Sequence, residues 1–307
     1  MKLFQNTING LRFKHWTLLE AFAYFLKGMA RELKIAPDFF LKFYKKVVNN
    51  AFNKKWLIKK DNENSYYDFK GAIIPDISTD KKKLYLLAFI FEDVFLIPCY
   101  YNDIYDKKVV ELLDKCMSEG PYGYSDGSFD VTIKKDDVVI DAGAWIGDFS
   151  AYTASKGAIS YAFEPIEENF NLLCKTVKLN NGKIYPVKKG LGSNECELNI
   201  LINKENSASN SIFNKEDSIE EKINLTTLDK FVKDNKIEKI DFIKADIEGA
   251  ERDMLKGATN VLKMFAPKLA ICTYHLPDDP EVLEKVILEA NPNYKIVQLR
   301  HKLFAAV

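Results

Sequence analysis

Three acidic residues follow predicted strands directly, where a buried strand gives way to a turn. Asp141 ends a run of β-branched residues, Glu164 ends a second strand-like run, and Asp246 comes just after a third. The carboxyl ends of parallel strands share one edge of an open α/β sheet, and ligands bind at that edge. A charged group at such a place is costly unless it is used or exposed. The three carboxylates therefore predict a ligand site, where perturbed titration would be useful.

A glycine turn follows the first of these acids. Gly143 and Gly147 frame the passage from the strand into a predicted helix, and glycine lets a ligand approach backbone that no Cβ obstructs. Glu164 lies 23 positions after Asp141, which fits one β-α-β unit whose second acid binds ribose hydroxyls. The alternative is an ordinary strand-to-helix turn with no ligand. The pair of acids favours a nucleoside-containing cofactor.

The residues within the turn narrow the choice of cofactor. A dinucleotide fingerprint needs a glycine two positions after Gly143, and this chain has Trp145 there. The bulky side chain disfavours close approach of a pyrophosphate, so the turn suits a ligand without phosphates at that point. A nicotinamide-dependent oxidoreductase is therefore the less favoured alternative. A catalytically silent module that binds a cofactor or a partner is the non-enzyme alternative.

A second group of charges surrounds Asp246. Lys244, Asp246 and Glu248 crowd together at the end of one strand, just before Gly249 permits a turn into a helix. We expect Asp246 and Glu248 to belong to the site. The alternative is a solvated loop whose acids favour the following helix N-terminus, and for Glu251 we prefer that interpretation.

A histidine reaches the same edge of the predicted sheet. The strand Leu269–Thr273 delivers Tyr274 and His275 there, and the chain has only three histidines. A lone histidine is more often structural than catalytic. Its ordinary pKa near 6.5 nevertheless suits a general base at neutral pH, so both roles remain open for His275.

The rest of the second half alternates strands and helices, which is typical of a doubly wound α/β domain. We expect Asn203 to Asn224 to be a functional or mobile loop, because it is too long for a tight connection. Thr226 with Asp229 predicts a helix cap, and Pro165 a helix start. The remaining predicted elements are the helix Ile166–Leu179, the strands Lys183–Lys188 and Glu197–Ile202, a helix ending at Ala290, and the strand pair Tyr294–Leu299 and Lys302–Val307.

The first hundred-odd residues have a different pattern, so we expect an N-terminal α+β extension over residues 1–118 and a cofactor-binding domain over 119–307. The extension would serve packing, homodimerisation, a substrate lid or, less favoured, membrane-surface binding. The loop Gly120 to Tyr124 could cap the cofactor with Tyr122 or Tyr124, or be a simple turn. The extension's predicted elements are the helices Trp16–Lys34, Pro37–Phe52 and Asp103–Met117 and strands between Tyr66 and Pro98.

Composition limits the class of protein. The chain has 307 residues, of which 47% are hydrophobic, and can bury a large core. Its 44 basic and 44 acidic residues balance, so no general attraction to nucleic acid or anionic membranes is expected. The five cysteines lack metal-site or disulfide spacing. Without a signal peptide or a transmembrane run in the sequence, we expect a cytoplasmic protein.

The stretches VVIDAGAWIGDFS, YAFEPIEENF, IDFIKADIEGAE, KLAICTYH and NYKIVQLRH together resemble the FkbM-type family of S-adenosylmethionine-dependent methyltransferases. The resemblance covers about Gly120 to Val307 and implies the doubly wound, mostly parallel seven-stranded sheet of class I methyltransferases. Where this family turn often has asparagine, the chain has Trp145. The resemblance implies cofactor contacts at Asp141, Gly143, Ala144, Gly147, Glu164, Pro165 and Asp246, with Tyr122 as a cap, and a reaction-side cluster of Asp246, Glu248 and His275.

The chemistry implied by this resemblance is attack of an acceptor hydroxyl on an activated methyl group. The acceptor would be a sugar, a glycan, or a lipid-linked or other secondary metabolite. Its proton would be removed by His275 or Asp246. A divalent cation on Asp246 and Glu248 could lower the hydroxyl pKa instead.

Overall fold

The computed structural model describes residues 57–59, 65–69, 71–75, 122–125, 128–203, 218–299 and 301–307. The chain divides into two compact units, Met1–Asp68 with Asp76–Met117 and Phe69–Pro75 with Ser118–Val307. In the first unit, β1 (Leu57–Lys59) pairs antiparallel with the start of β2 (Ser65–Phe69). The predicted N-terminal helices lie outside the described residues. The domain boundary, dimerisation through these segments and a cytoplasmic location therefore stay predictions.

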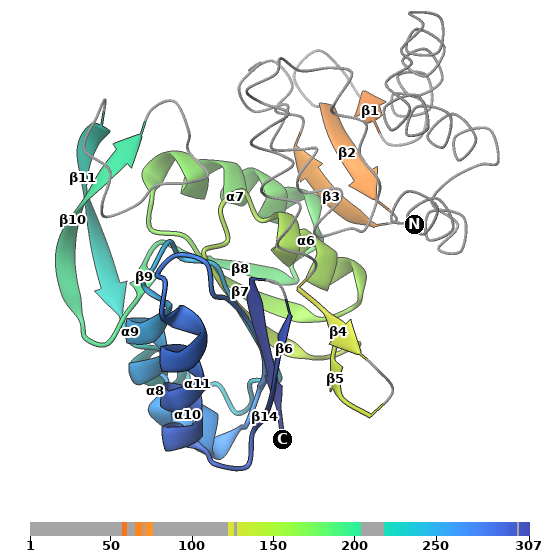
Figure 1. Cartoon of the computed structure of the whole chain (residues 1–307). Coiled ribbons are helices and arrows are strands. Elements are labelled where there is room, and N and C mark those ends of the chain that lie inside the picture. The colour runs from red at the N-terminus through yellow and green to blue at the C-terminus, as the bar shows by residue number, and fades with distance from the viewer. Residues whose placement is uncertain are drawn as a thin grey trace, which may run out of the picture. The chain divides into compact units, whose positions relative to one another are not determined.

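The second unit is built on a seven-stranded sheet (Figure 1). The strands are parallel except β15, which runs antiparallel to both of its neighbours. This order and orientation confirm the class I methyltransferase type of sheet. In spatial order the strands are β14 (Lys295–Leu299), β15 (Lys302–Ala306), β13 (Lys268–Cys272), β12 (Phe242–Ala245), β6 (Val138–Ala142), β7 (Ile159–Phe163) and β8 (Ile184–Val187).

Helices cover both faces of this sheet, so the strands at its centre are buried on both sides (Figure 1). On one face α6 (Asp148–Ser155) and α7 (Glu167–Leu179) pack over a small cluster that contains Ala162 and Leu173. The other face carries the main core, in which Ile243 and Ile271 of the strands meet Leu283 of a helix. Its helices are α8 (Leu228–Asp234), α9 (Glu251–Lys256), α10 (Thr259–Met264) and α11 (Asp279–Ala290).

The central strands β6 and β12 bring two charged residues together. Their register pairs Asp141 with Lys244, so a carboxylate and an ammonium occupy neighbouring positions in the middle of the sheet. Both strands end at the same edge, where the predicted site residues follow them.

A long hairpin contradicts the predicted loop at 203–224. Strand β10 (Cys196–Asn203) pairs antiparallel with β11 (Ser218–Thr226), so residues 218–224 are strand rather than loop. Ile219, Ile223 and Leu225 alternate with polar residues, which is the two-residue period of a strand. Residues 204–217 lie outside the described part. The short strand β9 (Gly190–Leu191) runs parallel to β11.

Two predicted helix starts are shifted. The N-cap of α8 is Thr227, whose hydroxyl accepts from the Lys230 N–H at 3.1 Å, so the prediction of Thr226 was one residue early. Pro165 precedes the N-cap residue Ile166 of α7, so it lies two residues before the helix begins. In the described part of the chain, no helix is both long and apolar enough to cross a membrane.

Within the second unit, Asn180 binds the backbone of the strand β3 (Ala72–Pro75). The Asn180 side chain accepts from the Ile73 N–H at 3.0 Å and donates to the Ile73 carbonyl at 2.5 Å. Asn180 is buried at the end of α7, so these two bonds replace the hydrogen bonds to water that the strand would otherwise make.

We expect Asn180→Ala to lower the free energy of unfolding by about 1–3 kcal/mol, because the partly buried N–H and C=O groups of Ile73 lose their bonds to Asn180. The matched control is Asn171→Ala, an exposed asparagine on the same helix, which should change stability by less than about 0.5 kcal/mol. Urea denaturation of both variants measures the difference. Equal losses would contradict this role of Asn180.

Candidate functional site

The glycine turn after β6 lies directly against the end of β12. Gly143 has φ +76°, and a Cβ built on it would come within 2.0 Å of the Asp246 carbonyl oxygen. Gly147, the N-cap of α6, has φ +83°, and its Cβ would lie 2.6 Å from Leu173 Cδ1. Both positions therefore require glycine. The backbone N–H groups of Gly143 and Ala144 donate to the Phe163 carbonyl, so they hold the turn to β7.

Glu164 closes this turn from the end of β7. Its Oε2 accepts from the Trp145 N–H at 2.9 Å, and its Oε1 accepts from the Ile166 N–H at 3.0 Å. The side chain of Asn169, which the sequence reading did not single out, reaches Oε1 at 3.5 Å. Burial raises the pKa of Glu164 to about 7, although these N–H donors act in the opposite direction. Pro165, its predicted companion, is half-buried beside it.

Trp145, within the glycine turn, has an unusual backbone conformation and a buried indole nitrogen without a hydrogen-bond partner. Trp145 has φ +48°, a conformation that L-residues rarely adopt, and its indole Nε1 is buried without a hydrogen-bond partner. An indole N–H normally finds an acceptor when it is buried. The turn therefore presents an unused donor where a cofactor is expected.

Asp141 is buried inside the fold and is not exposed at the edge of the sheet. It is fully buried, its Oδ1 is 3.2 Å from Lys244 Nζ, and its Oδ2 accepts from the Ser150 hydroxyl at 2.7 Å. Lys244 also donates to the carbonyls of Gly143 at 2.7 Å and Ala142 at 3.3 Å. A direct contact between Asp141 and the cofactor stays a prediction. Its carboxylate supports the turn through Lys244.

The charge of Lys244 is maintained by its surroundings. Burial opposes the ammonium form, but the carboxylates of Asp141, Asp246 and Asp148 outweigh it and raise the Lys244 pKa. Asp148 was not among the predicted site residues. It is the first residue of α6, and burial raises its pKa to about 7. Its position directly after Gly147 was the available signal, since acids favour helix N-termini.

Asp246 is held by two tyrosines. The Tyr122 hydroxyl donates to Oδ2 at 2.7 Å, and the Tyr274 hydroxyl donates to Oδ1 at 3.0 Å. Burial opposes ionisation, but Lys244, His275 and the Tyr122 hydroxyl together lower the Asp246 pKa. Of the two tyrosines predicted as a cap, Tyr122 thus reaches the strand-end acids. Tyr124 stacks on Phe304 instead.

His275 lies among three carboxylates. Its Nδ1 is 3.1 Å from Glu251 Oε1, and its Nε2 is 3.5 Å from Asp246 Oδ1 and 3.6 Å from Glu248 Oε2. Burial favours the neutral imidazole, but the contact with Glu251 and the charges of the other two acids raise the His275 pKa to about 9. The expectation of an unperturbed pKa near 6.5 is therefore wrong. These carboxylates therefore favour the protonated imidazole.

The two glutamates of this turn differ in environment. Glu251 is fully buried, and its carboxylate accepts from the N–H groups of Ile247 at 2.8 Å and Gly249 at 3.0 Å. It does begin α9, but the prediction of a solvated loop is wrong for it. Glu248 has φ +56°, its side chain is 27% exposed, and burial together with Asp246 raises its pKa to about 7.

Arg252, which the sequence analysis did not single out, binds two acids that follow His275 in the chain. Arg252 Nε donates to Asp279 Oδ1 at 2.7 Å, and its Nη2 donates to Asp278 Oδ1 at 2.5 Å. Asp279 is buried and also accepts from the Leu276 N–H at 2.8 Å. The start of α9 is thereby joined to the start of α11, with His275 between them in the chain.

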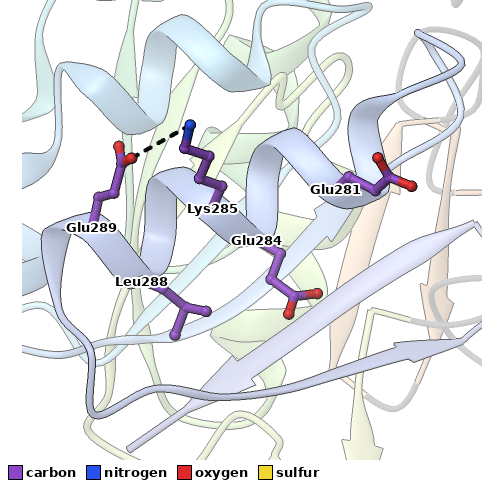
Figure 2. Close-up of a pocket in the computed structure, with 5 residues that line it drawn as sticks. All are labelled: Glu281, Glu284, Lys285, Leu288 and Glu289. Carbon is purple, nitrogen blue, oxygen red and sulfur yellow. Dashed lines mark ion pairs between the residues drawn. The ribbon is translucent and has the colours of Figure 1, made fainter.

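A surface groove elsewhere on the second unit does not involve these residues. Figure 2 shows its lining on α11, where the Lys285 ammonium is 3.8 Å from a carboxylate oxygen of Glu289. The other lining residues are Glu281, Glu284 and Leu288. Such an exposed ion pair contributes little, and none of the predicted site residues lines the groove.

Comparison with known proteins identifies the domain. A family model described as the methyltransferase FkbM domain matches residues 141–300. The hexuronic acid methyltransferase AglP of Haloferax volcanii is 28% identical over 168 residues, which cover 54% of this chain and 67% of the relative.

Solved structures give similar matches. The FkbM methyltransferase structure from Methylobacillus flagellatus KT matches with 21% identity and a TM-score of 0.46, over 74% of this chain and 59% of that one. This chain thus spans less than two thirds of that structure. Aeropyrum pernix fibrillarin in complex with S-adenosylmethionine matches with 11% identity and a TM-score of 0.38, over 58% of this chain and 70% of that one.

The raised pKa of Glu164 predicts a pH-dependent stability. Between the ordinary value of 4.5 and about 7, the folded chain keeps a proton that the unfolded chain has released. The retained proton therefore adds to the free energy of unfolding at low pH, and this contribution is lost as pH rises through the window. Glu164→Gln removes this contribution. Between about pH 4 and pH 8, the free energy of unfolding of the variant should therefore rise by about 3 kcal/mol relative to that of the wild type.

Urea denaturation across this pH range measures the effect. Glu168→Gln, an exposed acid in the first turn of α7, is the matched control and should follow the wild-type curve. Other acids titrate in all three proteins, so the difference isolates Glu164. Curves for Glu164→Gln and wild type that stay parallel would contradict the assignment.

Lys244→Met should destabilise the chain by about 3–5 kcal/mol, because it leaves the buried Asp141 carboxylate without its counter-charge. Adding Asp141→Asn to this variant should recover part of the loss, since the unpaired charge is then absent. Lys256→Met, an exposed lysine on α9, is the control. Thermal denaturation with calorimetry provides the measurement, and a loss for Lys244→Met no greater than for the control would refute the role of this pair.

Proposed function

The chain belongs to the FkbM methyltransferase domain family, and on this basis we propose that it transfers the methyl group of S-adenosylmethionine to a hydroxyl oxygen of an acceptor. The acceptor class is a sugar, a glycan, or a lipid-linked or other secondary metabolite. The AglP relative, named as a hexuronic acid methyltransferase, supports a sugar acceptor.

One observation carries this proposal. The backbone of the glycine turn touches the Asp246 carbonyl, so the cofactor turn and the acid cluster form one continuous surface at the ends of β6 and β12. Asp246, Glu248 and His275 then lie next to the place where the turn would hold a cofactor. A methyl donor and a hydroxyl acceptor need this proximity, because transfer takes place directly between them.

The residues of the turn fit S-adenosylmethionine. Glu164 accepts two backbone N–H bonds, and a carboxylate has lone pairs left for two ribose hydroxyls. The buried Trp145 Nε1 offers a donor to the cofactor, and Gly143 and Gly147 keep side chains out of the turn. The bound cofactor supplies a methyl group already activated by its positive sulfur.

The chain's own contribution is alignment and proton removal. Holding donor and acceptor in line and away from water can contribute about 7–11 kcal/mol to lowering the barrier. On the acceptor side, Glu248 is the most exposed carboxylate of the cluster, with a side chain 27% exposed against 16% for Asp246. We propose that the Glu248 carboxylate removes the proton of the acceptor hydroxyl. Asp246 and His275 orient the acceptor from the more buried side.

The test is methyl transfer by the full chain from labelled S-adenosylmethionine to uronic-acid-containing and neutral oligosaccharides. We expect labelled methyl ether that resists mild alkali. Label released by alkali would show esterification of a carboxylate, and an absence of label in all acceptors would contradict the activity.

Calorimetric titration with S-adenosylhomocysteine tests the cofactor half separately. Glu164→Gln should raise the dissociation constant about 10-fold or more, because it removes a charged acceptor worth about 1.5–3 kcal/mol. Glu168→Gln should bind like the wild type. Unchanged affinity in Glu164→Gln would refute the ribose contact.

A further inference from the structure

Both ring nitrogens of His275 are buried without a hydrogen-bond partner, and Nδ1 is in ion-pair contact with Glu251. The side chain is 7% exposed, and Nε2 is buried without a hydrogen-bond partner. This nitrogen points between two carboxylate oxygens, at 3.5 Å from Asp246 Oδ1 and 3.6 Å from Glu248 Oε2. These separations are too long for good hydrogen bonds, for which about 2.7–3.2 Å is usual.

Glu251 determines which form of the imidazole faces the two acids. Nδ1 lies 3.1 Å from Glu251 Oε1, and two backbone N–H groups fix that carboxylate in place. A ring nitrogen so close to a carboxylate oxygen must carry the proton, because two acceptors would repel each other. In the neutral ring Nε2 then has the free lone pair. Histidines that bind metals are commonly oriented by a carboxylate in this way.

The two separations measured from Nε2 fit ligands around one cation. Bonds of about 2.1 Å at tetrahedral angles place ligand atoms about 3.4 Å apart. The distances from Nε2 to the two oxygens are close to this value. Asp246 and His275 also belong to a group with Glu251 whose possible ligand atoms all lie within 4.8 Å of one another.

We propose that His275 Nε2, Asp246 Oδ1 and Glu248 Oε2 bind one first-row divalent cation, of the Mn²⁺, Fe²⁺, Co²⁺ or Zn²⁺ type. An imidazole with two carboxylates suits these ions, whereas Mg²⁺ prefers oxygen ligands and water. Glu251 supports the histidine, and Tyr274 and Tyr122 donate to Asp246, so the ligands have the outer partners that metal sites use.

The cation would have a role on the acceptor side. Three protein ligands leave a coordination position open, and Glu248, the most exposed of the three, lies on the side open to solvent. An acceptor hydroxyl bound there would lose its proton more readily, and the proton would pass to Glu248 or to water. This role rests on the proposed function, whereas binding of the cation does not.

Titration of the chelator-treated full chain with Co²⁺ tests binding without cofactor or acceptor. We expect one Co²⁺ per chain, with visible absorption that reports a nitrogen ligand, and affinity for Mg²⁺ at least about 10-fold weaker. His275→Gln should abolish the absorption. Glu251→Gln, which keeps all three ligands, should weaken Co²⁺ binding about 10–100-fold. His301→Gln, an exposed histidine outside the cluster, is the matched control and should bind like the wild type.

The outcomes separate this proposal from the methyltransferase assignment. No Co²⁺ absorption in the wild type, or equal absorption in His275→Gln and wild type, would overturn the metal site even if methyl transfer is observed. Circular dichroism shows whether His275→Gln is folded. If it is not, the comparison of Glu251→Gln with His301→Gln decides the question, and equal Co²⁺ affinities there would overturn the proposal.

Discussion

The candidate site depends on the contacts of one buried side chain, the ammonium group of Lys244. It lies on β12 beside Asp141, and it donates to the carbonyl of Gly143 in the turn above. One positive charge thus compensates a carboxylate inside the sheet and fixes the backbone in front of it. A buried ion pair is weak evidence for stability, because desolvation offsets most of its attraction. Its value here is geometric, since it ties the ends of two neighbouring strands together.

The same charge explains why the buried acids of the second unit differ in protonation. Asp148 and Glu164 have pKa values raised to about 7 because burial dominates. Asp246 is also buried, but Lys244 and His275 are near enough to lower its pKa. The Asp246 carboxylate, whose pKa is lowered, therefore contrasts with Asp148 and Glu164, whose pKa values are raised. That contrast follows from the position of two cations.

The sequence was sufficient where a local pattern determines the structure. The β-branched run before Asp141 and the run before Glu164 predicted β6 and β7, and the resemblance predicted the mostly parallel seven-stranded sheet. It was insufficient where partners come from distant segments. Nothing near His275 in the sequence shows that Glu251 would contact it, and the contact changes the expected protonation of the histidine.

Other contacts were missed for the same reason. The bonds of Arg252 to Asp278 and Asp279 cross from one helix to another, and no spacing rule signals them. For Asp141, the sequence indicated a position at the end of a strand but gave no sign of its buried ion pair with Lys244. A strand residue can point into the fold or toward the ligand edge, and its partner Lys244 on the next strand decides.

The two halves of the site are held by different kinds of contact, and this difference has a consequence for how each can vary. Besides the side chains of Lys244 and Glu164, backbone bonds and two glycines fix the glycine turn, and a side chain at either glycine would disrupt it. The cluster around His275 is fixed by the side chains of Glu251, Arg252 and Asp279. Side-chain contacts can be exchanged while the backbone stays in place, whereas a change at Gly143 would displace β12 itself. Under the proposed function, changes in acceptor preference are therefore better accommodated around His275, and the turn after β6 must keep its form.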